Sequence, residues 1–141
     1  ALEDGGRLLC GGGAPNGAEY AEGSYYLPTI IEGLGNDARL CRDEVFGPVL
    51  AIVPFDTEDE AVAIANDTEY GLVSYVFTES LSRGQRMIDR LETGMMGLNV
   101  GVVSNAAAPF GGWKMSGLGR EGGAEGIHEY LSTKYTLVPN V

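Results

Sequence analysis

The chain has 141 residues, 44% of them hydrophobic, so it can build a core and disorder is not expected. Its formal net charge of −11 argues against nucleic acids and anionic membrane surfaces as partners, because both need a basic patch. No apolar run reaches the roughly 18–20 residues of a membrane-spanning helix. Two cysteines, Cys10 and Cys41, are too few for a disulfide framework, so we expect thiols and a cytoplasmic protein. The only histidine, His128, does not give them the spacing of a metal site or of a catalytic Cys–His pair, so neither is predicted.

The first half of the chain predicts short strands and one helix. Residues 7–10 form an apolar run that stops at three consecutive glycines. Residues 25–31 are rich in aromatic and β-branched side chains, which is typical of a strand. Residues 49–53 are almost continuously apolar, which indicates a strand buried on both faces. Thr57 and Glu60 then fit a capping box at the start of a helix.

The second half continues this alternation. Residues 73–77 predict a strand, Ser80 can cap a second helix, and residues 95–100 predict a third strand. Gly94 stands where the C-terminal glycine of the second helix would belong. Strands that alternate with helices over short connections are typical of a parallel sheet, so we expect an α/β fold.

The last segments predict a short helix near 121–131 and a strand at 132–138. A terminal strand with no obvious partner in its own chain favours pairing with another chain. Residues 117–122 read G-L-G-R-E-G, a literal G-x-G-x-x-G, but no apolar strand precedes them and no βαβ unit follows. We therefore interpret these glycines as the start of a helix, with Glu121 in its first turn.

Single residues at the ends of the predicted strands could carry chemistry. Glu44 and Phe46 stand just before the strand at 49–53. They fit a turn with the ring in the core, or a carboxylate and an aromatic ring that bind a ribose and a flat heterocycle. Asn99 fits a turn former, and Phe110 fits a hydrophobic plug under a loop.

Five segments, taken in order, resemble the aldehyde dehydrogenase superfamily. They read E-V-F-G-P-V at 44–49, A-N-D-T-E-Y-G-L at 65–72, G-M-M-G-L-N at 94–99, P-F-G-G-W-K-M-S-G at 109–117 and G-R-E-G at 119–122. The resemblance implies that Glu44 binds the nicotinamide-side ribose of NAD or NADP. It also implies that Phe46 packs near the nicotinamide and that Phe110 lines the aldehyde pocket.

Residues 99–105 and 126–135 are similar to succinate-semialdehyde dehydrogenases. In that group Ser104 matches a serine that helps to hold the substrate carboxylate, although the arginines that normally accompany it match no segment here. Glutarate-semialdehyde dehydrogenases look similar in these segments. The resemblance therefore implies a small aldehyde substrate, with succinate semialdehyde as the expectation and the exact aldehyde left open.

The resemblance also implies a domain organisation. Residues 1–131 would belong to the α/β catalytic domain with its parallel sheet, and residues 132–141 would form a C-terminal oligomerisation strand and tail of a homo-oligomer. The family's nucleophile segment, F-x-x-x-G-Q-x-C, and its general-base segment, E-L-G-G, are not among the 141 residues. We therefore expect a C-terminal portion of an oxidoreductase that carries no catalytic residue and is inactive alone. The alternatives are a stand-alone assembly module and a small nucleotide-binding domain without catalysis.

Overall fold

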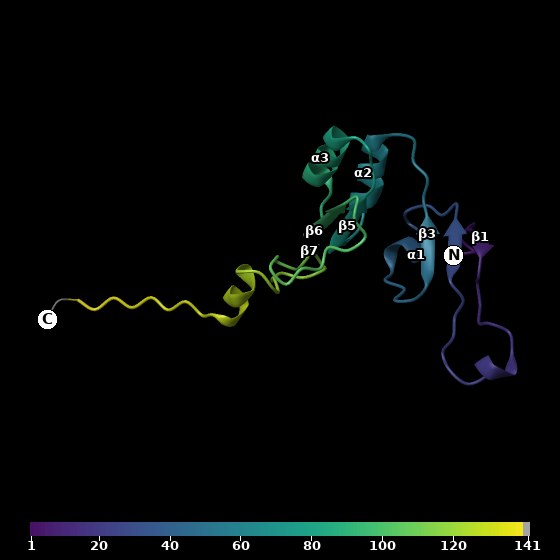
Figure 1. The fold of residues 1–141 in the computed structure, drawn as a ribbon, viewed down its shortest axis with the longest axis horizontal. Helices are drawn as coiled ribbons and strands as arrows, with labels where there is room; N and C mark the ends of the chain where they lie inside the picture. Colours follow the sequence, from purple (N-terminus) through teal and green to yellow (C-terminus); the bar gives the residue numbers. More distant parts are fainter. Residues whose placement is uncertain (140–141) are drawn as a thin grey trace. The chain divides into compact units, whose positions relative to one another are not determined.

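The computed structural model describes residues 1–139. The chain divides into two compact units, of which the first is Ala1–Asp67 and the second begins at Thr68. The elements, labelled in Figure 1 where there is room, are β1 (Arg7–Cys10), η1 (Ala18–Tyr20), β2 (Thr29–Glu32), α1 (Arg39–Arg42), β3 (Val49–Ile52), α2 (Glu58–Asn66), β4 (Tyr70–Gly71), β5 (Val73–Val76), α3 (Leu81–Arg90), β6 (Met95–Leu98), β7 (Trp113–Lys114) and η2 (Glu125–Tyr130).

The first unit contains a three-stranded sheet in the order β1-β2-β3. β1 runs antiparallel to β2, and β2 runs parallel to β3 in a register that places Thr29 opposite Val49. α1 lies in the connection between the two parallel strands. The buried residues Ile31, Leu34 and Ala38 form the core beside this sheet. The strand predicted at 25–31 is therefore present but begins four residues later, at Thr29.

β3 differs from the prediction of a strand buried on both faces. Its residues alternate between half-buried and exposed, and Leu50 and Ile52 remain 56% and 40% exposed. Side chains in a strand point to opposite faces in turn, so only one face of β3 packs within this chain. The apolar run at 49–53 therefore gives β3 a second apolar face, formed by Leu50 and Ile52, which this unit leaves exposed.

The two longer helices begin where their capping residues predict. The Thr57 hydroxyl accepts a hydrogen bond from the Glu60 amide at 3.1 Å at the start of α2. The Glu60 carboxylate accepts from the Asp56 amide at 2.8 Å, one residue before the position expected in a capping box. At the start of α3, Ser80 accepts from the Arg83 amide at 3.3 Å. These side chains satisfy amides that have no partner within a helix.

The second unit places α3 between two parallel strands, β5 and β6, whose register runs from Val73–Met95 to Val76–Leu98. Gly84 lets α3 approach β6 closely, because a Cβ atom there would lie 2.8 Å from the Leu98 side chain. The prediction of an α/β fold with parallel strands is confirmed by this pair and by β2–β3. The predicted strand at 49–53 belongs to the other sheet, however, and does not pair with 73–77.

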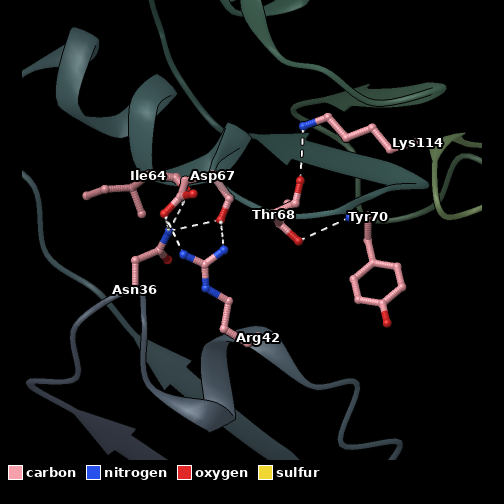
Figure 2. Close-up of polar contacts among 7 residues, drawn as sticks. All are labelled: Asn36, Arg42, Ile64, Asp67, Thr68, Tyr70 and Lys114. Atoms are coloured by element: carbon pink, nitrogen blue, oxygen red, sulfur yellow. Dashed lines mark hydrogen bonds and ion pairs between the residues drawn. The ribbon is translucent and has the colours of Figure 1, made fainter.

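A short antiparallel pair, β4–β7, lies in the same unit. The Lys114 ammonium group donates to the Thr68 carbonyl at 3.2 Å, and the Tyr70 amide donates to the Thr68 hydroxyl at 3.2 Å (Figure 2). Lys114 also forms an ion pair with Glu92 at 2.6 Å. These contacts hold β7 to the segment that leads into β4.

Gly94 is required for a reason other than the predicted one. α3 ends at Arg90, so Gly94 is not its C-terminal cap. The Gly94 amide donates to the Gly71 carbonyl at 2.9 Å, and a Cβ atom on Gly94 would lie 2.1 Å from the Gly111 carbonyl oxygen. Two backbone segments therefore approach each other at a point where only glycine fits.

The end of the chain also departs from the prediction. Glu121 is not in a helix: it forms an isolated bridge with Phe110, with amide-to-carbonyl distances of 2.7 and 2.8 Å. Only 125–130 is helical, as the 3-10 helix η2, and residues 131–139 belong to no helix or strand. The strand predicted at 132–138 is thus absent from this single chain, because a strand needs a partner for its ladder. Residues 140–141 of the predicted tail lie outside the described residues.

Candidate functional site

The first candidate segment is the loop between α1 and β3. α1 ends at Arg42 and Asp43 caps it, after which Glu44 and Phe46 follow as exposed residues. Phe46 has a φ of 51° and is 92% exposed. The alternative in which its ring lies in the core is therefore wrong. A left-handed backbone at an exposed aromatic residue costs free energy that packing in this chain does not return.

Glu44 lines a shallow hollow of about 310 Å³ in the first unit, together with Arg39, Leu40, Asp43, Val45 and Ala1. The Arg39 Nε donates to the Asp43 carboxylate at 2.6 Å, and this hydrogen bond, with the charge of Asp43, raises the pKa of the Arg39 guanidinium. Asp43 is thereby engaged within α1. An exposed carboxylate such as that of Glu44 has the geometry to accept hydrogen bonds from two neighbouring hydroxyls.

The structure adds a cluster that the sequence patterns did not predict. Arg42 donates to the Asp67 carboxylate at 2.9 Å and to the Asp67 carbonyl at 3.1 Å (Figure 2). The Asn36 amide group donates to the same two oxygen atoms and to the Ile64 carbonyl. We call Asn36, Arg42 and Asp67 the clamp. The only sequence signal for it was the segment 65–72, which the resemblance left without a role.

The second unit brings Ser104 and Phe110 together. Both line one hollow of about 340 Å³, with Asn105, Ala106, Ala108, Glu121 and Gly122 as the other lining residues. Asn105 shapes its rim, since its side chain accepts from the Ala107 amide at 2.9 Å. Phe110 and Glu121, which also line the hollow, are joined by the isolated bridge. A serine and a phenylalanine that line the same hollow suit a small ligand with an apolar body and a polar end.

Charge in this hollow comes from Glu121. No lining residue that the structure describes there is cationic. The nearest arginine in sequence, Arg120, lines a neighbouring hollow of about 360 Å³ and donates to the Gly112 and Gly119 carbonyls at 2.9 and 2.8 Å. A ligand carboxylate beside Ser104 would therefore need cations from residues outside this lining.

Asn99 is the turn former that its position predicts, with a φ of 55°. Its side-chain amide also pairs with the backbone of Thr78, accepting from the amide at 2.8 Å and donating to the carbonyl at 2.9 Å. These two bonds join the residue after β6 to the segment that follows β5.

Three further predictions concern thiols, metal ions and membranes. Cys10 and Cys41 are free cysteines, the first exposed and the second half-buried. Within residues 1–139, no three His, Cys, Asp or Glu side chains gather as a metal site would require. No helix in that part of the chain is long and apolar enough to cross a membrane.

Comparison with known proteins identifies the family. Residues 1–136 match the aldehyde dehydrogenase family. The chain belongs to this family. The match runs through both hollows and the clamp, so the order of motifs noted in the sequence reflects common descent. The cofactor and substrate roles of Glu44, Phe46, Ser104 and Phe110 stay predictions.

Individual family members show how much of an enzyme this chain represents. It is 44% identical over 138 residues to the NADP(+) succinate-semialdehyde dehydrogenase GabD of Escherichia coli K12, and 42% identical over 138 residues to the glutarate-semialdehyde dehydrogenase of Pseudomonas putida. Each alignment covers 98% of this chain but 28% of the relative. The crystal structure of a Mycobacterium tuberculosis aldehyde dehydrogenase complexed with NAD+ superposes with a TM-score of 0.85 at 40% identity, covering 96% of this chain and 29% of that one. The chain thus spans little more than a quarter of these aldehyde dehydrogenases.

Proposed function

We propose that this chain supplies the nicotinamide-side wall and part of the aldehyde pocket of an NAD(P)-dependent semialdehyde dehydrogenase. The observation that carries the proposal is Phe46, whose ring is 92% exposed on a left-handed backbone. Such a residue stabilises nothing in its own chain, so a ligand is the better reason for it. The exposed carboxylate of Glu44, in the same loop, is a suitable acceptor for ribose hydroxyls.

NAD or NADP fits these side chains by chemistry, since the cofactor offers a ribose and a flat ring. When bound, it accepts the hydride that leaves the aldehyde carbon. Glu44 would hold the ribose and Phe46 would pack against the flat ring, which fixes the orientation of the cofactor. Ser104 and Phe110 would hold the polar end and the apolar body of the aldehyde. None of the four residues attacks the substrate or removes a proton.

The 141-residue chain is therefore expected to be inactive alone. The nucleophile segment F-x-x-x-G-Q-x-C and the base segment E-L-G-G are not in it. Purified chain would be assayed with succinate semialdehyde and either NAD+ or NADP+, following reduced cofactor at 340 nm. We expect no turnover above buffer, because no thiolate is placed to attack the aldehyde. Turnover well above buffer would refute the inactivity.

The cofactor role is tested in an enzyme that carries this chain together with the nucleophile segment. Glu44→Gln keeps the shape of the side chain but removes its charge, so the KM for the cofactor should rise while the KM for the aldehyde changes little. Glu22→Gln, another exposed glutamate of the same unit, is the control and should leave both constants unchanged. Equal effects of the two substitutions would count against the ribose role.

The substrate role of Ser104 and Phe110 is tested by comparing an aldehyde that carries a carboxylate with one that does not. Ser104→Ala should raise the KM for succinate semialdehyde but not that for butanal, which has four carbons and no carboxylate. Phe110→Ala should raise both, because it removes apolar contact from either aldehyde. Ser24→Ala, at an exposed serine of the first unit, serves as the control. A parallel series with glutarate semialdehyde would decide between the two chain lengths.

A second function, assembly of a homo-oligomer in the cytoplasm, is supported by the end of the chain. Tyr135, Leu137 and Val138 are 83%, 74% and 75% exposed, and residues 131–139 pair with no strand of this chain. In this proposal 1–131 belongs to the catalytic domain and 132–141 pairs with a second copy. Light scattering on the purified chain should give a mass above the 14.9 kDa monomer, and Leu137→Lys should reduce it. A strictly monomeric, folded chain would exclude assembly through this segment.

A further inference from the structure

The clamp joins three segments of the first unit, because Asn36 and Arg42 both bind Asp67. Asp67 caps the C-terminal end of α2, Arg42 is the last residue of α1, and Asn36 precedes α1. Arg42 and Asn36 each donate to both the carboxylate and the backbone carbonyl of Asp67, at 2.9 to 3.1 Å (Figure 2). The end of α1 is therefore joined to the end of α2 through one donor from its last residue and one from the segment before it.

α1 needs such a tie in addition to the packing of Leu40 and Cys41 against the core of Ile31, Leu34 and Ala38. It contains four residues, a single turn, and a helix of that length has no stability by itself. Its other ion pair, Arg39–Asp43, lies within the helix and connects it to nothing else. The bonds of Arg42 to Asp67 are the side-chain contacts that join the last residue of α1 to another element.

Arg42 lies directly before the loop that carries Glu44 and Phe46. Glu44 is the second residue after it and Phe46 the fourth, so the backbone leaves the clamp directly into the loop that carries both exposed side chains. At its other end the loop is held by the Thr29 amide, which donates to the Pro48 carbonyl at 2.8 Å. The loop is thus fixed at both ends while Glu44 and Phe46 stay open to a ligand.

We propose that Arg42 is a positioning residue for the cofactor: by clamping onto Asp67 it sets the orientation of the loop that presents Glu44 and Phe46. The inference rests on the proposed function of those two residues. Arg42 touches neither cofactor nor substrate in this role. Arginine is needed because its planar guanidinium group donates two divergent bonds to one residue, whereas lysine would keep the charge but offer a single point donor.

The test compares Arg42→Lys with Arg7→Lys in an enzyme that carries this chain and the nucleophile segment. Arg7 is the matched control, because it also forms a double contact with one carboxylate, Glu32, but across β1 and β2 and away from the loop. Arg42→Lys should weaken NAD+ binding by about fivefold, the loss of roughly one ordinary hydrogen bond, with kcat at saturating cofactor changed less than about twofold. Arg7→Lys should change neither.

Hydrogen exchange without cofactor supplies a measurement that is independent of activity. Arg42→Lys should speed exchange of the amides at 43–47, and Asp67→Asn combined with Arg42→Lys should add little to either substitution alone. Wild-type NAD+ affinity in Arg42→Lys, or an equal loss in Arg7→Lys, would overturn the positioning role. If Glu44→Gln weakens NAD+ binding and Arg42→Lys does not, only this inference fails. If Glu44→Gln has no effect, the proposed function fails and the positioning role falls with it.

Discussion

Replacement of Phe46 by glycine should separate folding stability from ligand binding. Phe46 has a φ of 51°, which an L-residue adopts at a cost of roughly 1–2 kcal/mol and glycine adopts freely. Glycine also gains backbone freedom in the unfolded chain, which costs about 0.5–1 kcal/mol. The ring is 92% exposed, so its removal gives up almost no buried surface. The two opposing effects leave Phe46→Gly between unchanged and about 1.5 kcal/mol more stable than wild type.

Urea unfolding followed by circular dichroism measures this difference, with Phe46→Ala as the matched control that removes the ring but keeps the strain. A phenylalanine that served as a core plug would lose about 3–5 kcal/mol on truncation, so the two explanations are far apart. In an enzyme with the nucleophile segment, both variants should raise the Kd for NAD+, measured by calorimetry. A loss of more than about 1 kcal/mol of stability in Phe46→Gly would refute the assignment of this ring to a ligand.

Two further substitutions test how the second unit is built, both by the urea midpoint of the purified chain. Gly94→Ala should cost about 3 kcal/mol, because its Cβ would lie 2.1 Å from the Gly111 carbonyl oxygen, whereas Gly101→Ala, with nothing within 4 Å, should be nearly neutral. Equal costs would show that the close approach is not rigid. Asn99→Ala should be about 1 kcal/mol less stable than Asn99→Gly, since both lose the bonds to Thr78 but only alanine retains the left-handed strain. Identical midpoints would contradict that strain.

Sequence patterns predicted the helices and strands correctly where the interactions that start them lie within a few residues. Thr57 and Ser80 marked the starts of α2 and α3 because a cap acts on amides of the same turn. The pairing of β3 with β2 could not be predicted in this way, because an apolar run does not determine which strand lies beside it. Glu121 was placed in a helix because glycine and an acidic residue favour a helix start, whereas its bridge to Phe110 depends on tertiary contact.

The candidate site divides in the same way. The family motif singled out Glu44 and Phe46, and the structure then gave their exposure and the strain at Phe46. The clamp could not be predicted, because Asn36 and Arg42 reach Asp67 over sequence separations of 31 and 25 residues with no periodic pattern. A motif can single out candidate binding residues, whereas contacts between segments that are distant in the sequence are found only in the structure.

The chain exposes more surface than two folded units of its size would. Two separate folded units of half this mass would together expose about 8,500 Å², whereas the chain exposes 10564 Å². The surplus of about 2,000 Å² is more than twice the roughly 800 Å² that one partner buries in a standard protein–protein interface, and it includes the outer face of β3, with Leu50 and Ile52. Exposed apolar side chains that lie together on one face favour contact with another surface. β3, which follows the loop of Glu44 and Phe46, therefore has its second face available for contact with another surface.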